Sequence, residues 1–292
     1  MAEQLRFGVA VTPDAGDPAA MTALAQAADA AGLDLVAVQD HPYQPGHLDT
    51  WTALTHLGAR TERIGLLTDV ADLALRPAPM LAKAAASLDV LTGGRVELGV
   101  GSGGFPDAVA GMGGNAVRGG QAVEFTAEAL PLLRAALDAE SPIGMDGRHH
   151  RVAGYQPGPV PPHRIPVWLG AQGPRMLGLL GELADGWICP LNIYVPPAEV
   201  PAKQAVIDRA ALASGRRTSD VRRLYNVLGM IGDGYRGKGL FGSAEVWAQT
   251  LAEWARELRF DTFVYWPAGS QLDQLRLFAD EVVPRVRELL RS

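Results

Sequence analysis

A histidine and an aspartate stand side by side where a short apolar run ends, in the sequence Val38-Gln39-Asp40-His41-Pro42. Histidine is the side chain that most readily exchanges a proton near neutral pH, so His41 and the adjacent Asp40 are candidates for catalysis. Neighbouring residues on a strand point to opposite faces, so adjacency alone does not bring the carboxylate to the ring. A structural interpretation, in which His41 caps the strand before Pro42, stays open.

Four glycines follow another apolar run within six residues, in the sequence Gly99-Val100-Gly101-Ser102-Gly103-Gly104. Glycine costs backbone entropy, so such a cluster at a strand end indicates that the backbone approaches a ligand closely. The spacing Gly99-x-Gly101-x-x-Gly104 also fits the dinucleotide-binding fingerprint. That fingerprint follows the first strand of its unit and leads directly into a helix, and here it does neither. We therefore expect these glycines to admit a planar ring or a phosphate outside a nucleotide-binding fold.

A further apolar run ends in the sequence Gly170-Ala171-Gln172-Gly173-Pro174-Arg175, ahead of a helix-like pattern. Proline is favoured in the first helical turn because its missing N–H is not needed there. The helix start then offers free N–H groups, the positive end of a dipole and the Arg175 guanidinium, which together suit a phosphate. An ordinary capped helix is the alternative.

The third apolar run ends in Thr68-Asp69-Val70-Ala71-Asp72, whose carboxylates are of a type that binds metal. No His-x-His pair and no tight acidic cluster accompanies them. His47, Asp49 and His56 follow the second run, where we expect a solvated surface. The sequence therefore predicts no metal site.

Eight strand-like apolar runs alternate with helix-like segments along the 292 residues. The runs cover residues 5–11, 33–38, 64–70, 96–100, 165–169, 186–190, 224–231 and 262–266. This alternation predicts an α/β protein with a (β/α)8 TIM barrel, and a doubly wound open sheet is the alternative.

The interval between the fourth and fifth runs is unusually long. It contains a helix-like pattern near residues 121–137 and then a polar segment rich in proline and glycine, from Ser141 to His163. Insertions in barrels tend to line or cover the active-site face. We expect a single domain over residues 1–292, with a lid-like insertion at about residues 103–164 between strand 4 and strand 5.

Composition excludes several classes of function. The chain is 48% hydrophobic and 20% charged with a net charge of −6, which gives no support for nucleic-acid binding. A single cysteine, Cys189, excludes an internal disulfide framework and favours a reducing, cytoplasmic location. No targeting segment and no apolar stretch long enough for a membrane helix is present, so we expect no membrane partner.

Several segments recur together in one known family. They are Gln39-Asp40-His41, Thr68-Asp69-Val70, Arg76-Pro77, residues 93–101, residues 165–171, Ala184-Asp185-Gly186-Trp187 and the terminal helix over residues 278–290. In order and spacing they resemble the bacterial luciferase-like family of flavin- and deazaflavin-dependent oxidoreductases, over essentially the whole chain. The resemblance implies a (β/α)8 barrel with a lid insertion and a flavin-type ring over the carboxyl ends of its strands.

The resemblance also implies roles for individual residues. Asp40 and His41 would lie beside the reactive edge of the ring, and Asp69–Val70 matches the position of a non-proline cis peptide in relatives. Segments 101–104 and 170–175 match those that bind the cofactor side chain and its phosphate. Tyr43 and Phe105 are expected to line the substrate pocket.

Two cofactors serve this family, and Asp40-His41 resembles members that use coenzyme F420 rather than FMN. The resemblance therefore implies F420-dependent hydride transfer to or from a small organic substrate, with His41 exchanging the substrate proton. The sugar-phosphate enzyme of the family has a glutamate just after the glycine turn, where this chain has Phe105, so the general acid stays unassigned. An FMN-dependent monooxygenase using oxygen and a non-catalytic cofactor-binding protein are the alternatives. A homodimer and a flavin or F420 reductase partner are further expectations.

Overall fold

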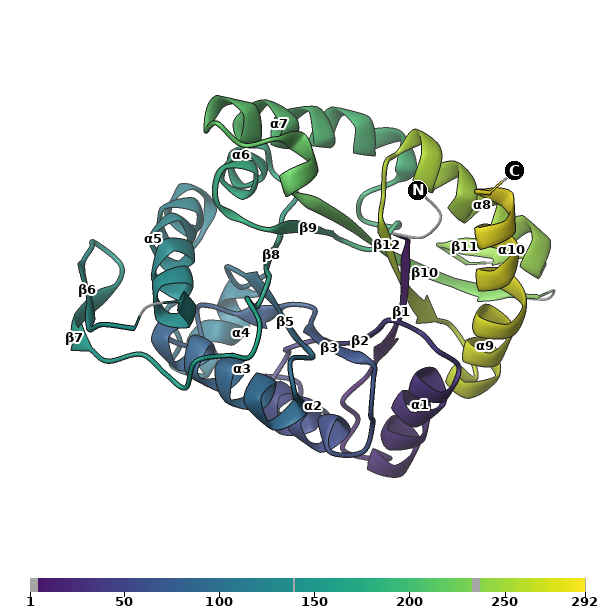
Figure 1. Ribbon diagram of the computed structural model, residues 1–292, viewed down its shortest axis with the longest axis horizontal. Helices are drawn as coiled ribbons and strands as arrows, with labels where there is room; N and C mark the ends of the chain where they lie inside the picture. Colours follow the sequence, from purple (N-terminus) through teal and green to yellow (C-terminus); the bar gives the residue numbers. More distant parts are fainter. Residues whose placement is uncertain (1–4, 139, 233–236, 292) are drawn as a thin grey trace.

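The computed structural model describes residues 5–138, 140–232 and 237–291. Within them, eight parallel strands close into a barrel ringed by helices (Figure 1). Around the ring, the strands are β1 (Arg6–Val11), β2 (Leu35–Val38), β3 (Gly65–Thr68), β5 (Val96–Gly101), β8 (Val167–Gly170), β9 (Gly186–Cys189), β10 (Arg222–Ile231) and β12 (Thr262–Pro267). Pairing of β12 with β1 closes the ring. The predicted (β/α)8 barrel is confirmed, and each predicted run overlaps one barrel strand.

Each barrel strand leads into a helix on the outside of the ring. The helices are α1 (Pro18–Ala30), α2 (Thr50–Gly58), α3 (Ala78–Thr92), α5 (Gly119–Asp138), α6 (Pro174–Leu183), α7 (Val200–Ala213), α8 (Ala244–Glu257), and α9 (Gln271–Leu277) with α10 (Val283–Leu289), joined by a π-helical turn over Phe278–Val282. Shorter elements are α4 (Pro106–Gly111), β4 (Ala71–Asp72), β11 (Leu240–Gly242) and two 3₁₀ turns, Pro197–Glu199 and Thr218–Asp220. Among the described helices, none has the length and apolar character needed to cross a membrane.

The interior of the barrel is a separate small core. It is formed by Ala10, Leu35, Ala37, Leu67, Trp168, Ile188, Leu224 and Val264, which come from seven different strands. Toward the amino end of the barrel, the Trp168 indole donates from Nε1 to Glu97 at 2.8 Å. The Glu97 carboxylate also accepts a bond from Arg6 at 2.5 Å. The Arg222 guanidinium lies 5.6 Å from the centre of the Trp168 ring. Because Arg6 and Arg222 begin their strands, these groups close the amino end of the barrel and leave the carboxyl end as its open face.

Two strand glycines exist because the barrel interior has no room for a side chain. A Cβ on Gly99 would lie 2.1 Å from the carbonyl oxygen of Thr68, and one on Gly186 would lie 2.1 Å from the indole ring of Trp168. Gly99, the first glycine of the predicted cluster, is therefore a packing position within β5. The remaining three glycines of the cluster lie at or beyond the end of the strand.

The long interval between β5 and β8 is divided by a barrel helix. Helix α5 packs against both α3 and α6 and occupies the fourth helical position of the ring. The expected insertion at residues 103–164 is thus two separate segments that flank α5. In the second segment, β6 (Ile143–Asp146) and β7 (Arg151–Tyr155) form a hairpin that projects beyond α5 (Figure 1). Glu128 of α5 ties this hairpin down by accepting backbone N–H bonds from residues 148–150, at 2.9–3.0 Å.

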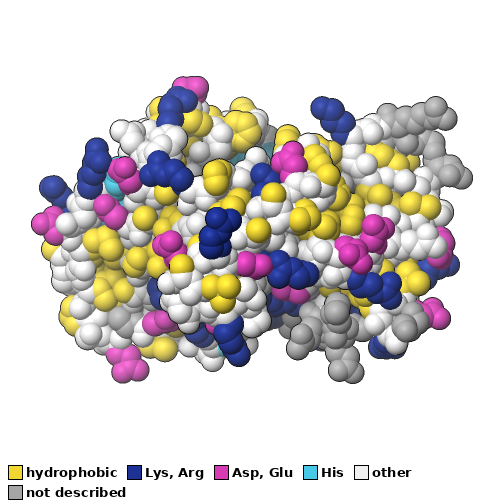
Figure 2. All heavy atoms as spheres, turned by 90° about the horizontal axis from the view of Figure 1, so that it is seen from above, with side chains coloured by type: hydrophobic (Ala, Val, Ile, Leu, Met, Phe, Trp, Pro, Cys, Tyr) yellow, Lys and Arg dark blue, Asp and Glu magenta, His cyan; other side chains and the backbone are white. Residues whose placement is uncertain are grey.

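Charged side chains are mixed on the surface. On the face drawn in Figure 2, Lys and Arg side chains are interspersed with Asp and Glu. This face carries no continuous basic patch of the kind that binds nucleic acids, in agreement with the net charge of −6.

Candidate active site

A cavity of about 230 Å³ lies at the carboxyl ends of the barrel strands. Among the described residues, its lining consists of Asp40, His41, Tyr43, Val70, Ala71, Asp72, Gly101, Ser102, Gly103, Gly104, Gly170, Ala171, Gln172 and Pro190. The structure thus brings together most of the site residues that the sequence indicated, from four different strand ends. Four of the candidates are not part of this lining, namely Asp69, Phe105, Gly173 and Arg175.

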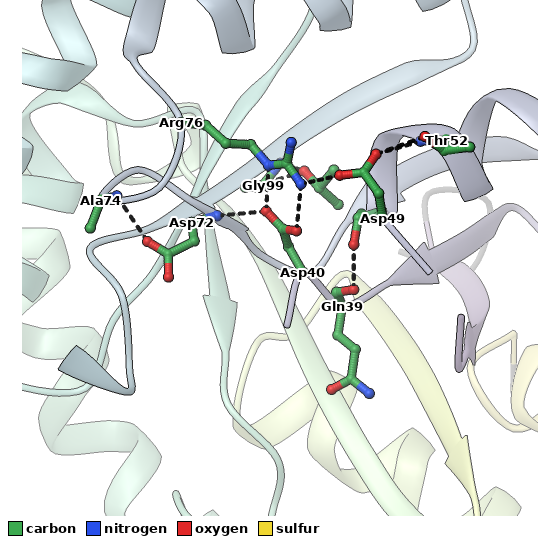
Figure 3. Close-up of polar contacts among 10 residues, drawn as sticks. Gln39, Asp40, Asp49, Thr52, Asp72, Ala74, Arg76 and Gly99 are labelled. Atoms are coloured by element: carbon green, nitrogen blue, oxygen red, sulfur yellow. Dashed lines mark hydrogen bonds and ion pairs between the residues drawn. The ribbon is translucent and has the colours of Figure 1, made fainter. Parts of the chain in front are cut away.

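A buried ion pair holds the segment that follows β2. The Asp40 carboxylate, with a side chain 0% exposed, accepts two hydrogen bonds from Arg76, each of 2.9 Å (Figure 3). The same guanidinium donates to Asp49 at 2.5 Å, and Asp49 is the N-cap of α2. The backbone N–H of Asp72 adds a bond of 3.1 Å to Asp40. One arginine therefore ties the end of β2 to the start of α2 and to the loop before α3.

The carboxylates of Asp40 and Asp49 balance the charge of Arg76 within this cluster. Burial by itself would lower the pKa of the guanidinium, but the bonds to Asp40 and Asp49 raise it overall. Burial likewise would raise the pKa of Asp49, yet the bonds from Arg76 and from the Thr52 N–H lower it overall. Arg76 is therefore a permanent cation that faces two carboxylates and does not line the cavity.

An aromatic cluster surrounds His41. Its imidazole stacks on Tyr43 with ring centres 5.4 Å apart, lies parallel to His47 at 6.5 Å and meets the Phe105 ring edge-on at 5.5 Å. Burial lowers the pKa of His41, and His47 lowers it further while Asp40 opposes the shift. His41 is thus held as a neutral imidazole at neutral pH, the form that accepts a proton. Burial, with Asp72 and Asp40 nearby, raises the pKa of Tyr43 to about 12, so its hydroxyl keeps its proton.

A second carboxyl, Asp69, lies buried inside the barrel mouth. The Asp69–Val70 peptide is cis, as the family resemblance predicted. The Asp69 carboxyl accepts a 3.2 Å bond from Asn226, whose own oxygen accepts a 2.8 Å bond from the Trp266 indole. The other carboxyl oxygen, Oδ2, has no hydrogen-bond partner among the described residues. Burial raises the pKa of Asp69 to about 7, against the opposing effect of the Asn226 bond.

Bare glycine backbone and one valine form the floor of the cavity. A Cβ on Gly101 would lie 2.8 Å from the Val70 side chain, and one on Gly170 would lie 3.3 Å from it. Gly103 has a φ of +90°, a conformation that favours glycine, whereas a Cβ on Gly104 would meet nothing within 4 Å. Two glycines therefore make room for Val70 and a third permits the turn. A floor of bare backbone and one apolar side chain leaves room for a planar ring.

The start of helix α6 borders the same cavity. Gly173 is the N-cap and makes no side-chain bond to the helix, and Pro174 occupies the first turn. Arg175 is exposed in that turn, and the Lys203 ammonium donates to the Gln172 carbonyl at 3.3 Å. Uncapped N–H groups beside two cations suit a phosphate group attached to the ring.

Sequence reasoning missed the residues that act across the barrel mouth. The sequence pattern indicates Asp72 only as a possible metal ligand and gives no indication of a role for Asn226. The expectation that Asp49 belongs to a solvated surface holds in part, because its side chain is 41% exposed while its carboxylate also bonds to Arg76 in the ion cluster. A signal for Asp49 was present in Asp49-Thr50-Trp51-Thr52, a typical helix N-cap. Among the described residues, no group of three potential metal ligands occurs.

Replacing Arg76 should show how much the ion cluster contributes to the free energy of unfolding. We expect Arg76→Met to lower the free energy of unfolding by about 3–5 kcal/mol, because the buried Asp40 carboxylate loses its partner. Arg118→Met is the matched control, since Arg118 pairs with Asp107 at the surface and should contribute less than about 1 kcal/mol. Urea unfolding of both variants measures the difference, and equally small losses would contradict the assigned role.

Asp69 should make stability depend on pH. The folded protein keeps the Asp69 proton up to about pH 7, whereas the unfolded chain loses it near pH 4. The folded state therefore binds more protons between these values, and stability falls as pH rises through them. Asp69→Asn should remove this loss, gaining up to a few kcal/mol on the wild type between pH 4 and pH 8.

Chemical unfolding at several pH values tests this prediction. Asp146→Asn, which alters an exposed carboxylate on the β6–β7 hairpin, is the control and should follow the wild type. If Asp69→Asn also follows the wild type across this range, Asp69 does not carry the proton.

Three comparisons with known proteins agree with this geometry. The sequence profile of the luciferase-like monooxygenase family matches residues 4–258. An F420-dependent glucose-6-phosphate dehydrogenase of Gordonia bronchialis is 32% identical over 199 residues, which cover 65% of this chain and 58% of that relative. A 5,10-methylenetetrahydromethanopterin reductase of Methanolobus tindarius is 32% identical over 223 residues, covering 74% of this chain and 63% of that relative. The chain thus matches less than two thirds of the length of these two relatives.

A solved structure shares the whole fold. An F420-dependent secondary alcohol dehydrogenase in complex with an F420–acetone adduct superposes with a TM-score of 0.85 at 16% identity, covering 97% of this chain and 99% of that chain. At this identity the likeness shows the fold alone. The family profile covers most of the chain, and the barrel and its glycine-floored cavity agree with it. The chain therefore belongs to the luciferase-like monooxygenase family.

Proposed function

We propose that this chain is a coenzyme F420-dependent oxidoreductase that transfers a hydride to or from a small organic substrate. The observation that carries the proposal is the position of His41, whose pKa burial lowers, at the wall of a cavity floored by glycine backbone and Val70. The Gordonia bronchialis relative, named as F420-dependent, supports the choice of cofactor.

The cavity offers a place for each part of the cofactor. Val70, with segments 101–104 and 170–172, forms a floor against which the ring would lie. Gly173 and Arg175, at the start of α6, would hold its phosphate. When bound, F420 accepts or supplies the hydride.

The remaining chemistry belongs to side chains of this protein. His41 exchanges the proton of the substrate oxygen, because its lowered pKa keeps the imidazole neutral and ready to accept. Asp40 is a positioning residue, since Arg76 occupies both oxygens of its carboxylate. Tyr43 lines the cavity beside the imidazole, and Phe105, which packs against His41 just outside the lining, would contact a substrate that extends beyond the cavity.

The wider organisation of the protein is also proposed. We regard residues 1–292 as one domain with a lid-like insertion at about residues 103–164, formed by the two segments that flank α5. A homodimer is supported by Met80 and Leu91 of α3, which are 62% and 75% exposed. The protein would act in the cytoplasm, where a reductase partner would restore the cofactor between turnovers.

Replacing His41 tests the catalytic assignment. We expect His41→Asn to lower turnover by about 10²–10⁴-fold, the usual contribution of a general acid or base, with cofactor affinity changed less than about threefold. F420 reduction by the best alcohol from a substrate panel, followed by absorbance, measures the first quantity. His56→Asn, on the exposed face of α2, is the control and should stay near wild type.

Other outcomes would identify other functions. Near-normal turnover of His41→Asn would remove His41 from catalysis. Oxygen consumption with reduced FMN, without reaction of F420, would indicate an FMN-dependent monooxygenase. Tight F420 binding with no turnover of any substrate would indicate a non-catalytic cofactor-binding protein.

A further inference from the structure

Asp72 is a buried residue whose carboxyl borders the cavity. The residue is 4% exposed, and it lines the cavity together with His41. Strand β4 pairs with β5 so that Asp72 lies opposite Gly101, at the edge of the cavity floor. A Cβ on Gly103 would lie 3.1 Å from the Asp72 carboxyl, so glycine at this position lets the loop pass close to it. The carboxyl therefore lies beside the floor against which the ring of the cofactor would lie.

The Asp72 carboxyl has capacity for a further partner. Its Oδ1 accepts a 2.8 Å hydrogen bond from the Ala74 N–H. Figure 3 shows the other carboxyl oxygen directed away from the Arg76 guanidinium. A carboxylate can accept about four hydrogen bonds, and a protonated carboxyl can donate one. Asp72 can therefore exchange a proton with a molecule in the cavity without giving up its bond to the backbone.

Burial and neighbouring charges set the proton affinity of Asp72. Burial raises the pKa of the carboxyl, and the Asp40 charge adds to the rise. Backbone N–H groups and the Arg76 guanidinium oppose it, but the overall shift is upward. Burial also lowers the pKa of His41. The two pKa values thus move toward each other, which enlarges the fraction of protein in which His41 is neutral while Asp72 keeps its proton.

Two side chains of the cavity lining are suited to exchange protons near neutral pH. The acidic and basic side chains of the described lining, tyrosine included, are Asp40, His41, Tyr43 and Asp72. Arg76 occupies both carboxyl oxygens of Asp40, with bonds of 2.9 Å. The raised pKa of about 12 keeps the proton on Tyr43. His41 and Asp72 remain.

Hydride transfer between an alcohol and a ring needs two such groups. Oxidation of the alcohol breaks its C–H bond, whose electron pair leaves with the hydride, and its O–H bond, whose proton goes to His41. The alcohol loses two electrons and the cofactor gains them. The hydride adds one negative charge to the ring, and a second proton balances that charge.

We propose that Asp72 is a second catalytic residue, which delivers a proton to the ring of the cofactor while His41 takes the proton of the substrate hydroxyl. The inference rests on the oxidoreductase function proposed above. In alcohol oxidation the Asp72 O–H bond breaks and an N–H bond forms on the ring, which leaves a carboxylate. In the reverse direction the same proton returns to Asp72. When the product leaves, His41 releases its proton to water and Asp72 takes one up.

The pH dependence of turnover tests this pair of roles. F420 reduction by the best alcohol of the panel should be fastest at intermediate pH, because His41 must be neutral and Asp72 protonated. Asp72→Asn should lower turnover by about 10²–10⁴-fold and lose the decline on the alkaline side, because an amide delivers no proton. F420 affinity, followed by tryptophan quenching, should change less than about threefold. Asp146→Asn, outside the cavity, is the control and should keep the wild-type profile.

A second measurement depends neither on turnover nor on a variant. The ¹³C NMR signal of the Asp72 carboxyl in the cofactor-free protein reports its titration directly. We expect this carboxyl to titrate above the ordinary aspartate pKa of about 4.

The possible results separate the inference from the function on which it rests. Failure of the wild type to reduce F420 with any alcohol of the panel would contradict the proposed function. If the wild type does reduce F420, near-normal turnover of Asp72→Asn or an alkaline decline kept in that variant would overturn the inference. Titration of Asp72 at or below the ordinary aspartate pKa would also overturn it. So would a loss of F420 affinity as large as the loss of turnover, because Asp72 would then act in cofactor binding.

Discussion

The buried contact between Asp40 and Arg76 is the constraint on which the rest of the site depends. A carboxylate with no exposed surface is tolerated only with a charged, well-oriented partner, and Arg76 supplies two bonds at 2.9 Å. Satisfying Asp40 brings the end of β2 beside the loop before α3, and the third bond of Arg76 adds the start of α2. His41, the next residue after Asp40, is thereby placed at the cavity wall. Asp40 thus positions the imidazole of His41 through the backbone that joins the two residues, and not by a direct side-chain contact.

The same cluster shapes the electrostatics of the cavity. Arg76 bonds to both Asp40 and Asp49, and its charge also opposes the rise that burial causes in the pKa of Asp72. The floor is built from Val70 and glycines, which add no charge. The imidazole of His41 and the ring of Tyr43 line the cavity beside the carboxylates of Asp40 and Asp72.

The fold was predictable because its signal is local and repeated. Each barrel strand is a short apolar run with a helix pattern after it, and eight such units leave few architectures. The glycine cluster was interpreted as a ligand cradle, which accounts for Gly101 to Gly104 at the cavity. Gly99 has another cause, the carbonyl of Thr68, which only the closed barrel brings near. The cis peptide at Asp69–Val70 was predicted from family resemblance, since no property of that dipeptide indicates it.

The side-chain network was not predictable for a related reason. Arg76 and Asp40 are 36 residues apart, and Asn226 and Asp69 are 157 apart on opposite sides of the ring. The sequence around each of these residues gives no indication of its hydrogen-bond partner. The pairings depend on closure of the barrel, which the pattern predicts, and on register and side-chain direction, which it does not.

A binding titration distinguishes F420 from FMN as the cofactor of this protein. Quenching of the fluorescence of the six tryptophans would follow the addition of F420 and, separately, of FMN. We expect F420 to bind with a Kd on the order of micromolar or below, and FMN to bind at least about tenfold more weakly. Preference for FMN, or binding of neither, would contradict the account.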